Sequence, residues 1–306
     1  MRISLFIILF ISFKSFSQSK TSKIVVDIET RKPIPYVAIE IIENGKGIYS
    51  DENGKFTIPL KNDESLKISH LGYKSISIKS EKIKDTLFLK KNVINLNEVI
   101  VWSGKIKEKE IGYIKKKKTL RWHIRPQTQL ATLIKLKNKI NRSYINEILI
   151  PINKIITGFK GKKLTQKTED FQSIFRVYIY KNENEKPGKN LLSTPILINT
   201  NQNSNDVLKV NISNEFIEFP ANGVFIGIEM IGDFNKQGGI TNYNNNKSVL
   251  PSFMYTNKKN KKLISVSFIK RVFGGYGWEK IDKTSKDFSM ISDYNMAVSL
   301  ILSVYE

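Results

Sequence analysis

The sequence contains no cysteine and only two histidines, His70 and His123. The absence of cysteine excludes disulfides, thiolate metal sites, a cysteine nucleophile and a lipid-modified cysteine. Neither histidine has a second one at a spacing that binds zinc. We therefore expect no metal site and no cofactor. The fold must be stabilised by burial of its core, and 306 residues are long enough for that.

Long apolar runs are also scarce. The one run, residues 3–13, follows Arg2 and precedes small residues at Ser15 and Ser17. This pattern predicts a secretory signal peptide over 1–17, with cleavage between Ser17 and Gln18. The run is too short to cross a bilayer, so we expect no transmembrane span after signal removal. The expected location is the periplasm, the outer membrane surface or outside the cell.

Acidic residues are fewer than basic ones, 28 against 50, which gives a net charge of +22. Residues 102–170 hold 18 basic and 5 acidic residues, and the densest part of this segment is Lys115, Lys116, Lys117 and Lys118. Such a run can bind a polyanion by counterion release. In an exported protein an anionic envelope surface is the expected partner, and nucleic acid is not. The alternative is a solvated basic linker over 102–127.

Residues 24–101 show no helical periodicity and instead contain six or seven short β-branched or alternating runs, separated by turns. One turn, Asp51–Gly54, ends in Asn-Gly and predicts a hairpin between the runs at 48–50 and 56–58. Strands at this spacing predict a β-sandwich.

The order of several short motifs in this segment resembles the carboxypeptidase-regulatory-like (transthyretin-type) domain. The residues that carry the resemblance are Asp27, Thr30, Pro33-Ile34-Pro35, Ala38, Ser50-Asp51, Gly54, Phe56, Ile58 and Leu71-Gly72-Tyr73. Residues 96–101 resemble the end of this module in exported envelope proteins, including TonB-dependent receptors. The resemblance implies a transthyretin-like sandwich over 24–101 that holds no catalytic residues. Ser22-Lys23 stands where the family usually has glycine.

Residues 128–306 contain about ten further strand-like runs, among them the alternating segment 175–180. Turns are expected at 185–188 and in the asparagine-rich stretches 199–206 and 242–247. Such a series without intervening helices predicts a second, larger, jelly-roll-like sandwich. The phrase from Phe175 through Pro187 to Glu229 is also similar to jelly-roll domains found behind this regulatory module. The fold class expected for the whole chain is therefore all-β.

Two kinds of side chain could form a site. The glycine-rich segment 273–278 presents Tyr276 and Trp278, which could stack on a sugar ring, or could instead fold onto the sandwich around a tight turn. Four carboxylates lie beside expected turns and could in principle supply a glycosidase pair: Glu183, Glu185, Glu215 and Glu218. Nothing in the sequence brings them together, and no nucleophile motif or phosphate loop is present.

These features predict a non-catalytic binding or structural protein of the cell envelope. Its expected partner is a carbohydrate or an envelope protein, bound by the second domain. Two alternatives remain open at this point. One is an accessory component of a TonB-dependent outer-membrane uptake system, and the other is a hydrolase of glycans or peptides.

Overall fold

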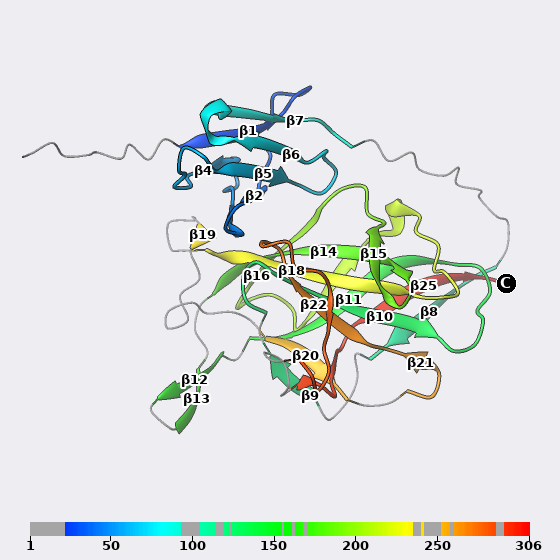
Figure 1. Ribbon diagram of the computed structural model, residues 1–306. Helices are drawn as coiled ribbons and strands as arrows, with labels where there is room; N and C mark the ends of the chain where they lie inside the picture. The colour runs from blue at the N-terminus through cyan, green and yellow to red at the C-terminus, as the bar shows by residue number, and fades with distance from the viewer. Residues whose placement is uncertain are drawn as a thin grey trace, which may run out of the picture.

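The computed structural model describes residues 22–92, 105–113, 119–122, 124–154, 156–160, 163–167, 171–234, 240–241, 252–257, 260–285 and 291–306. This part of the chain is built of strands, with two short 3₁₀ turns, η2 (Ser80–Lys82) and η3 (Ser213–Glu215), and no α-helix. The all-β prediction is confirmed. Figure 1 shows a small N-terminal sandwich set against a larger C-terminal one.

The N-terminal sandwich consists of two sheets. One has the order β4-β1-β7, formed by β1 (Lys23–Asp27), β4 (Lys55–Phe56) and β7 (Thr86–Leu89). The other has the order β3-β2-β5-β6, formed by β2 (Ala38–Ile41), β3 (Lys46–Tyr49), β5 (Ser65–Ser69) and β6 (Ile76–Lys79). Alternate residues of both sheets meet in one core that includes Val25, Ile39, Phe56, Ile68 and Leu87.

The turn Asp51–Gly54 is present, but the predicted hairpin around it was wrong. Strand β3 before the turn pairs with β2, whereas β4 after it pairs with β1 in the other sheet. The turn therefore connects the two sheets. Gly54 has φ 71°, and a Cβ there would lie 2.6 Å from the carbonyl oxygen of Val25. Only glycine tolerates both the φ and this approach.

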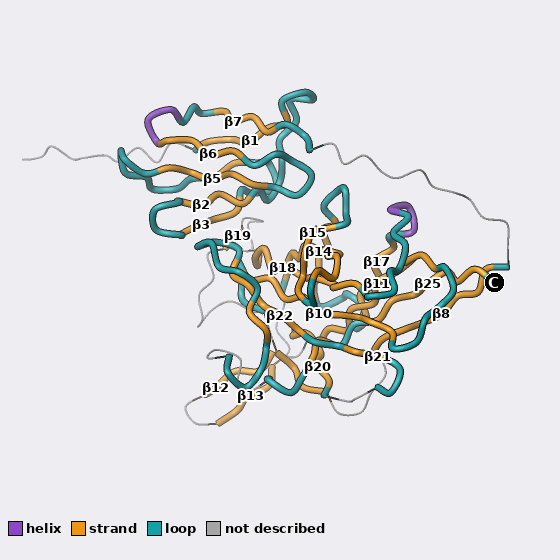
Figure 2. The backbone as a smooth tube through the Cα atoms, turned by 45° about the vertical axis from the view of Figure 1, so that its right-hand side comes forward, coloured by secondary structure: helices purple, strands orange, loops and turns teal. Residues whose placement is uncertain are grey.

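The larger sandwich also has two sheets, which Figure 2 shows from a second side. The first has the order β15-β14-β18-β10-β22-β23, with β16 beside β14, β19 beside β18 and β21 beside β10. Its strands are β10 (Thr128–Leu136), β14 (Gln172–Glu183), β15 (Lys186–Asn190), β16 (Ile196–Asn201), β18 (Val224–Phe234), β19 (Ile240–Thr241), β21 (Leu263–Ile264), β22 (Ser267–Arg271) and β23 (Glu279–Lys280).

The second sheet has the order β24-β20-β11-β25-β8, with β17 beside β11 and β9 beside β20. Its strands are β8 (Ile106–Gly112), β9 (Thr119–Trp122), β11 (Ser143–Asn153), β17 (Val207–Asn211), β20 (Ser252–Thr256), β24 (Asn295–Met296) and β25 (Ser299–Tyr305). The strands of the two sheets are interleaved along the chain, and their inner faces share one core. Phe175 of the first sheet packs against Phe253 of the second, with ring centroids 5.0 Å apart. A separate hairpin, β12 (Ile156–Lys160) with β13 (Lys163–Lys167), projects from this body.

The predicted linker over 102–127 was wrong for its described part. Residues 106–112 form β8, which pairs along the whole of β25, and residues 119–122 form β9, which pairs with β20. Strand β8 is an edge strand whose residues 106–110 are exposed, while Ile111 is buried. Charged residues are a usual feature of edge strands because they discourage pairing with other chains. These charges are the reason that the sequence predicted a linker over this segment.

The turn expected at 185–188 lies two residues earlier. Asn184 and Glu185 both have positive φ, 53° and 62°, and Glu183 pairs with Lys186. This is the geometry of a two-residue hairpin turn with positive φ at both central positions. Pro187 therefore lies in β15, the edge strand of its sheet, where the missing N–H is tolerated.

Candidate functional site

The two domains are joined by a buried polar cluster centred on Glu229 of β18. Its carboxylate accepts hydrogen bonds from the hydroxyl of Tyr49 at 2.8 Å, the hydroxyl of Tyr178 at 2.5 Å and the side-chain amide of Gln129 at 2.5 Å. Arg176 Nη1 forms an ion pair with it at 3.4 Å. Tyr49 belongs to the N-terminal domain and the other four residues to the larger one. The cluster therefore fixes one domain on the other.

Backbone conformation adds to this attachment. Tyr36 has φ 54°, and its carbonyl accepts a hydrogen bond of 2.7 Å from Arg176 Nη2. Gln127 has φ 64°, and its side chain donates to the carbonyl of Gly47 at 3.0 Å. Non-glycine residues adopt such φ values only when their surroundings hold them there. Both strained residues contact the other domain.

The Glu229 cluster is buried from solvent and is therefore structural. Glu229 and Arg176 are 1% and 2% exposed. Burial, followed by the nearby charge of Glu229, raises the pKa of Tyr49 well above its usual value, so the hydroxyl keeps the proton that it donates. Removing one partner of such a buried pair costs about 3–5 kcal/mol, because the other charge is left uncompensated.

Next to this cluster, the 273–278 loop of the larger domain contacts the smaller domain. Phe273 is buried against Tyr49, with ring centroids 5.5 Å apart. The N–H of Gly274 donates to Glu40 Oε1 at 2.7 Å. Gly274 has φ 89°, and its Cα lies 2.7 Å from the position of a Cβ on Gly45. The N-terminal domain therefore holds the base of this loop.

The structure places the two predicted aromatic residues of this loop differently. Tyr276 is 60% exposed, and the guanidinium of Arg271 lies 5.5 Å from its ring centroid. Trp278 is half-buried on the outer face of the first large sheet, 5.4 Å from the ring of Tyr180. The Nζ of Lys270 lies 4.8 Å from the centroid of the Trp278 ring. Tyr276 is thus available to a solute, and Trp278 mainly supports Lys270.

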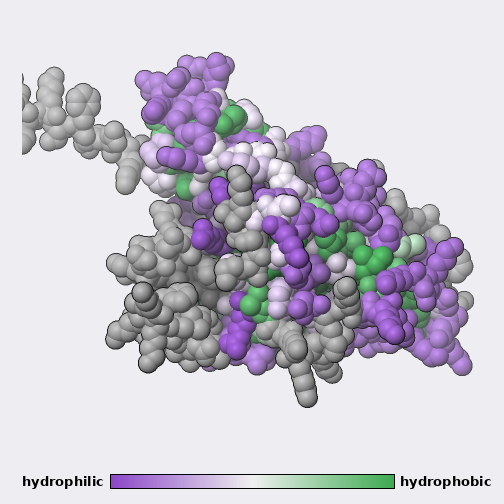
Figure 3. Space-filling view, turned by 60° about the horizontal axis from the view of Figure 1, so that its bottom comes forward, coloured by the Kyte–Doolittle hydropathy of each residue, from purple (hydrophilic) through white to green (hydrophobic). Residues whose placement is uncertain are grey.

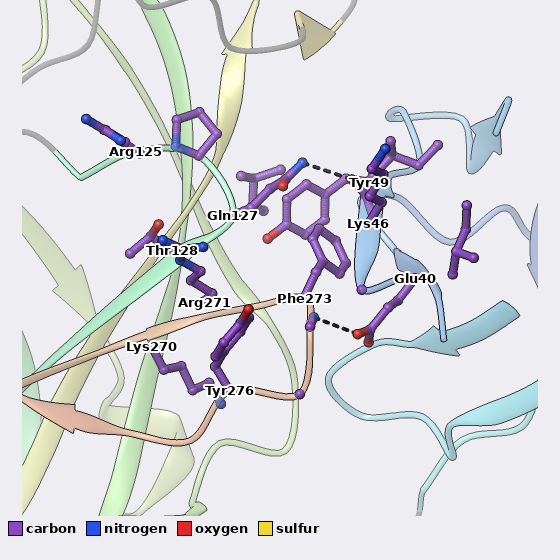
Figure 4. Close-up of a pocket in the computed structure, with 18 of the residues that line it drawn as sticks. Glu40, Lys46, Tyr49, Arg125, Gln127, Thr128, Lys270, Arg271, Phe273 and Tyr276 are labelled. Carbon is purple, nitrogen blue, oxygen red and sulfur yellow. Dashed lines mark hydrogen bonds between the residues drawn. The ribbon is translucent and has the colours of Figure 1, made fainter. Parts of the chain in front are cut away.

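A groove of about 2100 Å³ runs between the two domains beside this loop. Figure 4 shows its two walls, with Glu40, Lys46 and Tyr49 on the N-terminal domain and Thr128, Lys270 and Tyr276 on the larger one. Apolar side chains of the larger sandwich also line it, including Ile124, Leu130, Tyr255, Ile269, Ile281 and Ile291. Figure 3 shows that hydrophilic side chains dominate the described surface on another face of the molecule.

Basic side chains surround this interdomain groove: Lys46, Lys55, Lys67, Arg125, Lys270 and Arg271. Four carboxylates also line the groove; one is Glu279 of β23, and the other three accept hydrogen bonds from backbone N–H groups. Glu40 accepts from Gly274, Glu43 accepts from the N–H of Ser65, and Asp51 accepts from the N–H groups of Asn53 and Lys55. Burial lowers the pKa of Lys270, the charge of Glu229 raises it, and the charge of Lys67 lowers it further. The groove can therefore attract an anion.

Three of the four carboxylates considered as a glycosidase pair are held in separate local contacts, and the fourth, Glu185, lies in the turn between β14 and β15. Glu183 accepts a hydrogen bond from the N–H of Lys189, and Glu215 accepts from Ser193 and Thr194. Glu218 pairs with Arg142 at 3.2 Å. Among the residues that the structure describes, no group of acidic residues and histidines could hold a metal ion.

Other predicted features fall outside the described residues, namely the signal peptide over 1–17 and Lys115, Lys116, Lys117 and Lys118. His70 is described, and its ring is buried, with neither nitrogen hydrogen-bonded within the described part of the chain.

Sequence reasoning did not identify Glu40, Lys67, Glu229 or Lys270 as site residues. Of the strands that hold them, β5 alternates most clearly, and this period could have indicated that Lys67 faces away from the core. No described helix is long and apolar enough to cross a membrane.

Comparison with known proteins identifies the first domain. Residues 24–101 match the family model of the CarboxypepD_reg-like domain, which confirms the resemblance over that segment. No curated protein sequence matches the chain. One similar solved structure contains the cysteine protease and lectin-like domains of Cwp84, a surface layer associated protein of Clostridium difficile. It is 11% identical with a TM-score of 0.37, and the match covers 84% of this chain and 51% of that one.

A second solved structure, that of infectious bursal disease virus Gt strain, is 10% identical with a TM-score of 0.13. The match covers 93% of this chain and 59% of that one. The present chain thus corresponds to little more than half the length of either structure. At these TM-scores neither likeness bears on its function.

Proposed function

We propose that this protein is a non-catalytic binding protein of the cell envelope and that it binds a glycan in the interdomain groove. The observation that carries the proposal is Tyr276, a largely exposed aromatic ring on a loop whose base is held by the other domain. A ring on a fixed support loses little conformational freedom when a ligand stacks on it, and such preorganisation favours binding.

The absence of catalysis is part of the same proposal. Three of the four candidate carboxylates, Glu183, Glu215 and Glu218, are engaged in local contacts, and the Glu229 cluster is closed to solvent. A general acid or base must come within hydrogen-bond reach of its substrate. The export of the protein remains a prediction from the N-terminal sequence and gives the groove access to envelope polysaccharides.

The test is retention of the purified chain on immobilised glycans, both neutral and acidic. We expect retention on at least one glycan class without product release, and a loss of about tenfold or more in affinity for Tyr276→Ala. Stacking of a nucleic-acid base on an aromatic side chain is worth about 1–3 kcal/mol, and we take the same range for a sugar ring. Phe216→Ala is the matched control, because Phe216 is also an exposed aromatic, at 53%, and lies outside the groove.

Three results would contradict the proposal. They are equal weakening by both variants, turnover of a retained glycan, and failure of every glycan to bind. In the last case, crosslinking of the chain to a single envelope protein would assign the groove to a protein partner instead.

A further inference from the structure

Two lysines from different domains converge on the interdomain groove. Lys67 lies on β5 of the N-terminal domain, and Lys270 lies on β22 of the larger one. Neither forms an ion pair with any residue that the structure describes within 4.0 Å. Both line the same groove, and burial lowers the pKa of Lys270, with the positive charge of Lys67 adding a smaller effect in the same direction. The domain arrangement therefore brings two like charges together, which is unfavourable without a counterion.

The described residues that line the groove include six basic side chains and four carboxylates, so basic groups are in excess. One of the carboxylates, Glu279 of β23, lies on the strand beside Lys270. The carboxylates of Glu40 and Glu229 each accept hydrogen bonds from other groups. Glu40 faces Lys67 on the neighbouring strand, but its Oε1 accepts the N–H of Gly274. Glu229 acts on Lys270 electrostatically, yet its two oxygens already accept hydrogen bonds from Tyr49, Tyr178 and Gln129. Trp278 contributes the negative face of its ring to Lys270, which offsets part of one charge only.

We propose that Lys67 and Lys270 form an anion subsite of the interdomain groove and that this subsite binds an acidic group of a glycan. The group would be the carboxylate of a uronic acid, or a sulfate or phosphate ester. This inference rests on the proposed function, because it names the class of glycan. Hydrogen bonds between ammonium groups and such oxyanions are about twice as strong as neutral ones.

The position of the subsite gives a reason for the two-domain arrangement. Arg271 precedes the loop, and its guanidinium lies beside Tyr276, which would receive the sugar ring next to the acidic group. A ligand held by Lys67 and Lys270 contacts both domains at once. The N-terminal domain thereby supplies a binding residue as well as the support for the loop.

The experiment compares oligogalacturonate with its methyl ester by calorimetric titration of the full chain. The ester retains the sugar backbone and lacks the charge. We expect the acidic form to bind at least about tenfold more tightly at low salt, with the difference shrinking as ionic strength rises. Lys67→Gln and Lys270→Gln should each remove most of that difference, because they weaken binding of the acid far more than binding of the ester. Lys209→Gln, at an exposed position on β17 outside the groove, is the control.

A second measurement follows the side-chain ammonium of Lys270 by NMR with inorganic sulfate as the probe. Sulfate should raise the pKa of Lys270 in the natural sequence, and Lys67→Gln should raise it without sulfate. Sulfated and phosphorylated oligosaccharides of matched length then distinguish the acidic groups.

The failures can be told apart. Equal binding of acid and ester in the groove, with no effect of either lysine, overturns the subsite and leaves glycan binding in place. Absence of binding by all glycans contradicts the proposed function. In that case a Lys270 signal that is unchanged by sulfate overturns the anion site as well, whereas a shifted signal keeps an anion site and overturns its assignment to a glycan.

Discussion

At the residue scale, His70 illustrates how the domain contact acts on one side chain. Its ring is buried beside Tyr73, at 5.4 Å between centroids. Burial lowers the pKa of His70 to about 3, and the positive charge of Arg176 in the other domain adds to this effect. The folded protein thus holds this histidine neutral over most of the acidic range.

We predict that His70 makes the protein less stable as pH falls. The unfolded chain takes up a proton at this residue below about pH 6.5, whereas the folded chain does so only near pH 3. The stability associated with neutral His70 is complete above pH 6.5 and is lost toward pH 3, by up to about 1.4 kcal/mol per pH unit. His70→Phe should flatten the fall in free energy of unfolding between pH 6 and 4, measured by urea denaturation. Parallel curves for the two proteins would exclude this role.

Tyr276 could be identified from the sequence because glycine-rich aromatic segments are local signals. The residues around it could not. Tyr49 and Glu229 are separated by 180 positions, and Glu40 and Gly274 by 234. A single sequence contains no local pattern that pairs such residues. Lys67 and Lys270 likewise could not be singled out among 50 basic residues, because their place in one groove depends on how the domains meet.

At the scale of elements, strands with alternating apolar residues were predictable because the period of two is visible locally. In β14, Phe175, Val177 and Ile179 enter the core, while Arg176 and Tyr178 face the N-terminal domain contact. Strand β8 was missed because an edge strand with one buried residue near its end shows no such period. The Asn-Gly turn was predicted correctly, but the pairing of the strands on either side of it was not. Turn chemistry does not determine which sheet each of these strands joins.

Strand β8 also supplies a test of its own placement. Ile111 and Ile106 lie on the same strand, but Ile111 is 5% exposed and Ile106 is 55% exposed. We predict that Ile111→Ala lowers the free energy of unfolding by about 2–5 kcal/mol, because it leaves a cavity in the large core. Ile106→Ala should change it by less than about 0.5 kcal/mol. Equal effects in denaturant titrations would mean that 106–112 is not bound to β25 as described.

At the scale of the whole molecule, the two sandwiches form one unit through Gly47 as well as through the Glu229 cluster. A Cβ on Gly47 would lie 2.3 Å from Cδ1 of Phe273, which is buried between the domains. The CarboxypepD_reg-like domain could be recognised from its sequence motifs. Its contact surface could not, because the glycines and tyrosines that form it also occur in its ordinary turns and strands.

We predict that Gly47→Ala uncouples the domains. The added methyl must displace Phe273, at a cost of about 1–3 kcal/mol for overpacking. Scanning calorimetry should show one cooperative transition for the natural sequence and two for the variant. Gly277→Ala is the control, since no atom lies within 4 Å of its added Cβ. A single unshifted transition in Gly47→Ala would show that the contact does not hold the domains together.

The central claim is that both domains contribute to one binding groove, and backbone NMR during titration with oligogalacturonate tests it most directly. We predict that amide signals around Lys67 in β5 and those of the 273–278 loop shift together and give one common dissociation constant. Shifts confined to a single domain, or located on strands away from the groove, would contradict the claim.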